Sequence, residues 1–270
     1  MTTDNTTDSP DHERLRSAST GLEVLDQMLG GKGLPRFTGI CIEGPPNVGK
    51  RTLCMQFLFA ALQRGEACIY VSYRHTWHRV LEKFSQFNWE LSPYMNKGVL
   101  RIVDNASVLS GVDLDKEINF MSDPQKKAIS FCKALHNPEA YGDFLLSHVR
   151  ETTGSAGAAG PGIAVIDNVS ARLDLIRDPS AASRYLQQFR VKLAEETGLT
   201  SLHIHTPTAS EHAVRVRMAE GGLIELQFKE GHHSGRQRRL RVASMPFPHD
   251  DTWHRFDITR EGIRVWDMEK

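Results

Sequence analysis

One glycine-bounded loop constrains the fold of this chain more than any other feature. The apolar run at 37–43 before it predicts a short buried strand, and the run at 52–62 after it predicts a buried helix. In that arrangement, backbone N–H groups at the start of the helix cradle phosphate oxygens, and a lysine neutralises them. A ligand-free turn explains the glycines and prolines, but not Lys50 at the positive end of the helix dipole. The predicted phosphate-binding loop is Gly44-Pro45-Pro46-Asn47-Val48-Gly49-Lys50-Arg51.

The last residue of the loop departs from the phosphate-binding pattern, which places a serine or threonine there to ligate Mg²⁺. The guanidinium of Arg51 offers only hydrogen-bond donors. Its charge about 4 Å from Mg²⁺ would cost roughly 8 kcal/mol at an effective dielectric near 20. Thr52 does not substitute, because one step along a helix rotates the side chain by about 100°. We therefore expect a phosphate site made by residues 44–52, and no metal ligand among them.

The rest of the chain alternates predicted strands and helices. Such alternation indicates an α/β fold with a mainly parallel central sheet flanked by helices, because parallel neighbours need a crossover. Thr20 is expected to cap a helix at 20–29, and residues 105–140 show no clear pattern. The strands are expected at 67–72, 99–104, 163–167 and 200–205, the helices at 77–87, 141–149 and 181–196, and antiparallel C-terminal strands at 223–228, 238–243, 254–258 and 263–266.

Length and charge restrict the function classes. The 270 residues suffice for one large domain, and Lys+Arg equals Asp+Glu at 33 each, so charge gives no reason to expect nucleic acid or a membrane surface as partner. Residues 1–17 contain no apolar stretch, and we expect a disordered tail there rather than a signal peptide or membrane span. Cys41, Cys54 and Cys68 fall in apolar segments, which is typical of buried cysteines in a reducing cytoplasm.

Several segments together resemble KaiC-like ATPases, a branch of the RecA/RadA superfamily. The resemblance implies a single RecA-like P-loop NTPase core over residues 18–270, ATP as the ligand, and a tendency to form rings of six. In the family, the aspartate that matches Asp167 holds metal-bound water. The matching segments are Ser19-Thr20-Gly21-Leu22, Leu34-Pro35-Arg36, the loop itself, Ile166-Asp167-Asn168-Val169-Ser170, Phe256-Asp257-Ile258-Thr259 and Gly262-Ile263.

The departures from the family fall where catalysis is expected. Active relatives carry two adjacent glutamates after the second strand, whereas this chain has Ser72-Tyr73-Arg74-His75. A lysine and an arginine that reach the neighbouring subunit are replaced within 242–246. Asp167 is expected either to cap a loop amide or to pair with Arg51 in place of the metal site.

These departures predict a catalytically degenerate ATP-binding protein of the cytoplasm, with a regulatory or assembly role and no strict need for Mg²⁺. The expected partners are nucleotide and other subunits, in a homo-oligomeric ring or a mixed ring with an active homologue. The alternatives are an active KaiC- or RadA-type ATPase, with His75 a conceivable base near neutral pH, and an accessory ATPase of DNA recombination.

Two further clusters were weighed and assigned structural roles. His203 and His205 share one strand face, but no third ligand has metal-binding spacing in the sequence, so both are expected in the core. The basic cluster Arg236, Arg238, Arg239 and Arg241 is interpreted as a solvated or inter-subunit face, because few aromatics are interleaved with it.

Overall fold

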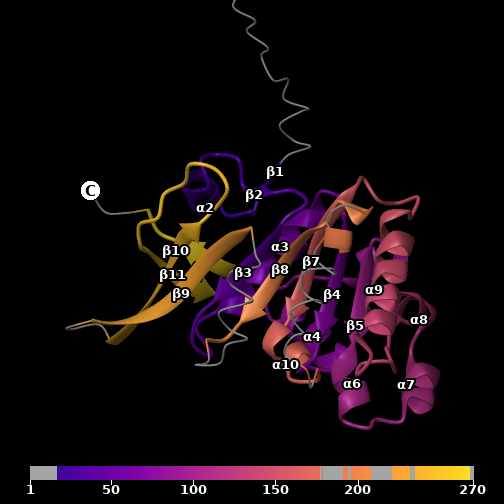
Figure 1. Cartoon of the computed structure of the whole chain (residues 1–270). Coiled ribbons are helices and arrows are strands. Elements are labelled where there is room, and N and C mark those ends of the chain that lie inside the picture. Colours follow the sequence, from indigo (N-terminus) through magenta and orange to yellow (C-terminus); the bar gives the residue numbers. More distant parts are fainter. Residues whose placement is uncertain are drawn as a thin grey trace, which may run out of the picture.

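A ten-stranded mixed sheet organises the chain (Figure 1). The computed structural model describes residues 17–176, 178, 191–193, 196–207, 221–231 and 235–267. In spatial order the strands are β12 (Gly262–Val265), β11 (His254–Thr259), β10 (Gly235–Ser244), β9 (Gly222–Gly231), β3 (Gly39–Glu43), β8 (Thr200–His205), β7 (Pro161–Asp167), β4 (Ala67–Ser72), β5 (Leu100–Asp104) and β6 (Ile129–Ser130). In this order, neighbouring strands from β9 to β6 pair in parallel, and those from β12 to β9 pair antiparallel.

Helices cover both faces of this sheet. Residues of α3 pack with Ile40 and Ile42 of β3 on one face, and residues of α9 pack with Val71 and Ile166 on the other. A separate antiparallel pair joins β1 (Ser17–Ala18) to β2 (Leu34–Pro35). The described helices are α2 (Glu23–Met28), α3 (Lys50–Gln63), α4 (Trp77–Ser85), α5 (Ser92–Asn96), α6 (Asn105–Leu109), α7 (Leu114–Phe120), α8 (Asp123–Ala128), α9 (Pro138–Thr153) and α10 (Val169–Leu173). None of the helices in these ranges is long and apolar enough to cross a membrane.

The α/β class with C-terminal antiparallel strands is confirmed, and the local differences have physical causes. The expected cap of the first helix is wrong: α2 begins at Glu23, and the hydroxyl of Thr20 instead accepts from the backbone N–H of Leu22 at 3.0 Å. Residues 105–137 contain three short helices and a two-residue strand, each too short for a clear periodic pattern, and α9 begins at Pro138. The expected helix at 181–196 falls mostly outside the described residues, as does the expected tail except for Ser17.

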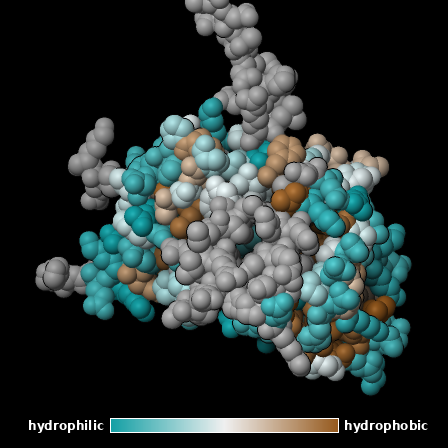
Figure 2. All heavy atoms as spheres, in the orientation of Figure 1, coloured by the Kyte–Doolittle hydropathy of each residue, from teal (hydrophilic) through white to brown (hydrophobic). Residues whose placement is uncertain are grey.

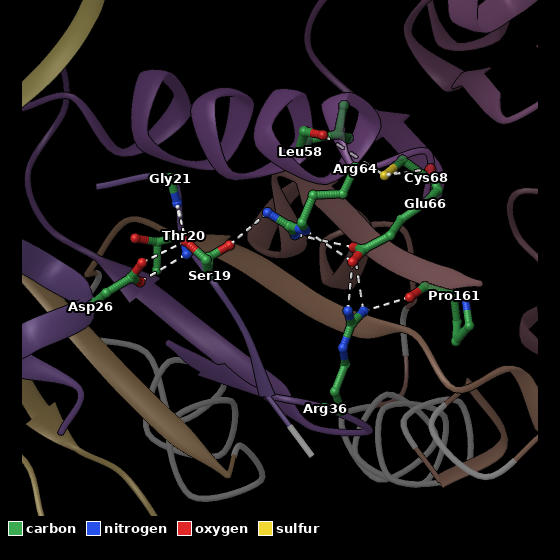
Figure 3. A network of polar contacts seen from close by, with 10 residues as sticks. All are labelled: Ser19, Thr20, Gly21, Asp26, Arg36, Leu58, Arg64, Glu66, Cys68 and Pro161. Atoms are coloured by element: carbon green, nitrogen blue, oxygen red, sulfur yellow. Dashed lines mark hydrogen bonds and ion pairs between the residues drawn. The ribbon is translucent and has the colours of Figure 1, made fainter. Parts of the chain in front are cut away.

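A network of polar contacts fastens the amino-terminal ends of the strands (Figure 3). Glu66, just before β4, accepts from Arg36 at 2.6 Å and from Arg64 at 2.9 Å. Arg36 also donates to the carbonyl of Pro161, the first residue of β7, at 2.5 Å, and Arg64 donates to the carbonyl of Ser19 at 3.0 Å. The network therefore joins the N-terminal segment to the starts of two central strands.

The opposite ends of the strands carry the loops that position the site. Asp104, the last residue of β5, caps α6 through the backbone N–H of Ser107 at 2.8 Å. The same carboxylate accepts from the backbone N–H of Trp77, the first residue of α4, at 2.9 Å. These contacts fix where α4 starts relative to the sheet, and α4 contributes to the cavity described below.

Candidate functional site

The glycine-bounded loop joins β3 to α3, as the sequence predicts. At Gly44 a Cβ atom would lie 2.3 Å from the carbonyl oxygen of Leu226, so no larger residue fits. Gly49 has φ of 122°, a conformation that side chains rarely adopt, and α3 begins at the next residue. The loop thus ends at a free helix N-terminus, where backbone N–H groups are available to an anion.

The side chain of Lys50 folds back over the loop. Its Nζ donates to the carbonyl of Gly44 at 2.5 Å and to that of Pro45 at 2.8 Å. Burial lowers the pKa of Lys50 to about 8. A poorly solvated ammonium group beside a free helix N-terminus gains more from a bound anion than an exposed one does.

Arg51, which is half-buried, and Asp167, which is buried, form a bidentate ion pair. Arg51 Nε donates to Asp167 Oδ2 at 2.5 Å, and its terminal nitrogen donates to Oδ1 at 3.1 Å. Tyr70 donates its hydroxyl to Oδ2 at 2.7 Å, and Asp167 has no solvent exposure. Burial and the charge of Asp167 raise the pKa of Tyr70, which keeps it a neutral donor. The structure therefore contains the ion pair, and not the loop cap, of the two roles considered for Asp167.

A cavity of about 590 Å³ opens beside this ion pair. Asp167 is the single carboxylate among its described lining residues, and it is already paired with Arg51. Lys50, Arg74 and Lys83 add positive charge. Of the residues predicted from the sequence, Pro46, Asn47, Gly49, Lys50, Arg51, Thr52 and Asp167 line the cavity, whereas Gly44, Pro45 and Val48 shape the loop behind it. An excess of cations over carboxylates around a helix N-terminus, as in this lining, is suited to a polyanion such as a chain of phosphates.

One wall of the cavity, which carries the cation Lys83, was not predicted from the sequence. Lys83, Gln86 and Phe87 line it from α4 and the residues just after it. Their i, i+3, i+4 spacing places them on one side of the helix, but nothing in the sequence shows which side of α4 faces the loop. His75 also lines the cavity, and its pKa is lowered by burial and by the charge of Arg51, so its imidazole is neutral at pH 7.

A second cavity lies away from the loop. It has about 670 Å³ and is bounded by the start of α2 and the β11–β12 turn. Its charged side chains are of both signs: Glu23, Arg260, Glu261 and Arg264. This mixture has no preference for an anion, so the smaller cavity beside the loop is the better candidate for a phosphate ligand.

The fold and this site together define a RecA-like P-loop ATPase. The family model described as "ATPase: KaiC" matches residues 18–270, and the chain belongs to that family. Family membership supports ATP as the ligand class of the site.

Relatives and solved structures agree with this assignment. A UPF0273 protein of Pyrococcus horikoshii is 26% identical over 93% of this chain and 94% of its own length, and one from Methanopyrus kandleri is 29% identical over 93% and 92%. The circadian clock protein KaiC2 of Synechocystis is 34% identical over a shorter stretch, 31% of this chain and 15% of its own. The crystal structure of a KaiC-like protein from P. horikoshii covers 93% of this chain and 99% of its own, with a TM-score of 0.71 and 18% identity, and shows the same fold.

Proposed function

We propose that this KaiC-like protein binds ATP through its phosphates without requiring Mg²⁺, hydrolyses little or no ATP, and acts in the cytoplasm as a regulatory or assembly component. The observation that carries the proposal is the Arg51–Asp167 ion pair, with Arg51 Nε 2.5 Å from Asp167 Oδ2. In this pair the carboxylate of Asp167 is bound to Arg51 and is not available as a metal ligand. The pair also puts a cation where the phosphate-binding pattern places the hydroxyl ligand of Mg²⁺.

The residues of the cavity fit phosphates and do not fit a divalent metal. Phosphate oxygens need donors and positive charge, which the helix N-terminus, Lys50, Arg74 and Lys83 offer. Mg²⁺ needs oxygen ligands, and a guanidinium at the position of one ligand repels it. The carboxylate of Asp167 already accepts three hydrogen bonds, two from Arg51 and one from Tyr70. Binding Mg²⁺ there would require this pair to be broken first.

Calorimetric titration with ATP in EDTA tests the binding half of the proposal. We expect saturable binding to the unmodified protein and at least about fivefold weaker binding to Lys83→Ala, because an exposed charge contact to phosphate contributes about 1 kcal/mol. Arg79→Ala is the matched control, since Arg79 lies one turn earlier on α4, pairs with Glu82 and does not line the cavity. No binding in EDTA, or equal losses in both variants, would contradict the proposal.

The alternative of an active ATPase depends on His75. Its lowered pKa leaves a neutral imidazole in the cavity, which is the protonation state that a general base requires. Phosphate release over hours distinguishes the two functions. We expect a rate no higher than that of the Lys50→Ala variant, whereas a clear rate that disappears in both Lys50→Ala and His75→Ala would establish the active ATPase.

An exposed apolar corner supports the assembly role. Figure 2 shows hydrophobic atoms gathered over the region of α6 and α7, where Leu109, Ile118 and Phe120 are 41%, 40% and 88% exposed. Apolar side chains grouped in this way favour contact with another protein. A homo-oligomeric ring, or a mixed ring with an active homologue, would supply such a contact.

A further inference from the structure

Three side chains of types that can bind a metal meet on one face of the sheet, and the cavity beside the Arg51–Asp167 pair lies on the other face. Cys41, Glu43 and His205 each offer one ligand atom, and these atoms all lie within 4.8 Å of one another. All three residues are buried. The neighbouring residue Ile204 lines the phosphate cavity, and successive strand residues point to opposite faces. The cluster therefore lies on the other face of the sheet from this cavity.

The parallel pairing of β3 with β8 creates the cluster. Cys41 and Glu43 are two residues apart on β3 and share one face, and His205 lies directly opposite Glu43 in the register. The sequence shows His203 and His205 at ligand spacing but does not show that the remaining ligands come from β3. His203 lies opposite Cys41, yet it does not belong to the group whose ligand atoms converge.

The distance between His205 and Glu43 fits a shared metal better than a direct hydrogen bond. His205 Nδ1 lies 3.4 Å from Glu43 Oε2, which exceeds the usual range for an N–H···O bond. Within the described part of the chain, Nδ1 makes no hydrogen bond. A tetrahedral zinc ion holding one nitrogen and one oxygen at about 2.0 Å keeps those two atoms about 3.3 Å apart. The observed separation matches that value.

We propose that Cys41, Glu43 and His205 bind a zinc ion that links β3 to β8 beneath the phosphate-binding loop. One thiolate, one imidazole and one carboxylate form a mixed sulfur, nitrogen and oxygen set, which suits Zn²⁺ and does not suit Mg²⁺ or Ca²⁺. On binding, the Cys41 thiol loses its proton to solvent and the sulfur bonds the metal. The fourth position of the tetrahedron is left for water or another ligand. Because Glu43 immediately precedes Gly44, the ion would also stiffen the start of the loop.

Cobalt titration of the full-length protein tests this proposal in the absence of nucleotide. The protein is first freed of metal with a chelator and then titrated with Co²⁺, which takes the same geometry and absorbs light. We expect a thiolate-to-cobalt charge-transfer band that saturates at one equivalent and disappears when Zn²⁺ is added. A wild-type protein without that band would overturn the proposal, whatever the variants do.

Paired variants identify the ligands. Cys41→Ser should lose the charge-transfer band, and both Cys41→Ser and His205→Gln should bind Zn²⁺ more than about 100-fold more weakly, beyond the loss typical of a residue that only orients a ligand. Cys54→Ser and His203→Gln are the controls, since both are buried and neither belongs to the cluster. Circular dichroism confirms that each variant is folded. A band retained in Cys41→Ser, or equal losses in the controls, would show that the metal binds elsewhere.

Discussion

Two networks, each of arginine around a buried carboxylate, lie at opposite ends of the parallel strands. At the amino-terminal ends, Glu66 accepts from Arg36 and Arg64 (Figure 3). At the carboxyl-terminal ends, Asp167 accepts from Arg51 and Tyr70. Glu66 lines neither of the two cavities described above, whereas Asp167 faces a cavity with further cations.

Under the proposed function, the Glu66 network has a structural role, whereas the Asp167 pair lies beside a ligand site. Ligands of open parallel sheets bind in the crevice at the carboxyl-terminal ends of the strands, and only the Asp167 network lies there. The chemistry of the two networks is alike, so their positions in the sheet account for the difference in role. Each should respond to mutation in its own way: the first through stability, the second through ligand affinity and metal dependence.

The largest expected effect comes from removing the carboxylate of the structural network. Glu66→Gln should lower the free energy of unfolding by about 3–5 kcal/mol, because it leaves Arg36 and Arg64 without their buried counter-charge. Urea denaturation measures this change. ATP affinity of the folded protein should stay the same. Glu82→Gln breaks an exposed pair with Arg79 and should change stability by less than about 1 kcal/mol; equal effects would remove the contrast.

The next effect concerns the lysine of the loop. Lys50→Ala should weaken ATP binding by about 1.5–3 kcal/mol, or roughly 10- to 150-fold, because a charge-assisted contact to phosphate is lost. Stability should hardly fall, since the removed cation is poorly solvated. Calorimetry with ATP and urea denaturation measure the two quantities. The exposed Lys97 provides the control variant Lys97→Ala. If Lys50→Ala lost as much stability as Glu66→Gln, Lys50 would have a structural role like that of Glu66.

The pH dependence of ATP binding gives a smaller, graded effect. Lys50 has a lowered pKa of about 8, so it is mostly protonated at pH 7 and mostly neutral at pH 9. A bound phosphate favours the charged form, and affinity should therefore fall above pH 8 by up to about tenfold per pH unit. Lys50→Arg, whose guanidinium stays protonated, should flatten the profile. Identical slopes in both proteins would show that another group controls binding.

The smallest expected effect is on self-association of the protein. It comes from a substitution at a third location, outside both networks. Phe120→Ser removes the most exposed large apolar side chain of the α6–α7 corner and should weaken self-association by about tenfold, near 1.4 kcal/mol. Phe37→Ser changes another exposed phenylalanine and serves as the control. Light scattering across protein concentration gives the result. A strict monomer at high concentration, with or without ATP, would contradict the assembly role.

The sequence predicted those features of the fold and the site that depend on the local pattern of residues. The strands at 67–72 and 200–205 have the observed bounds, because buried β-branched and aromatic runs are distinctive. The loop followed from one motif, and the Arg51–Asp167 pair was one of the two roles that the sequence left open for Asp167. Residues 105–140 did not follow, since α6, α7 and α8 have five to seven residues each and too few turns for a periodic signal.

The remaining site residues depend on tertiary pairing. Asp104, the last residue of β5, holds the start of α4 by accepting a hydrogen bond from the backbone N–H of Trp77. This contact positions α4 so that Lys83 lines the cavity. Glu43 and Cys41 meet His205 through the parallel register of β3 and β8. Neither of these contacts can be predicted from neighbouring residues in the sequence. The Glu66 network is of the same kind only in part, because Arg36 lies 30 residues before the carboxylate, whereas Arg64 lies two residues before it.

The metal dependence of ATP binding tests the central claim most directly. A ligand present at one hundred times its dissociation constant stabilises a protein by about 2.7 kcal/mol, which thermal denaturation detects readily. The account predicts that ATP stabilises the unmodified protein equally in EDTA and in Mg²⁺, whereas Arg51→Thr, with the metal-ligating hydroxyl restored, is stabilised more in Mg²⁺ than in EDTA. Stabilisation of the unmodified protein by ATP only when Mg²⁺ is present would contradict the role assigned to Arg51.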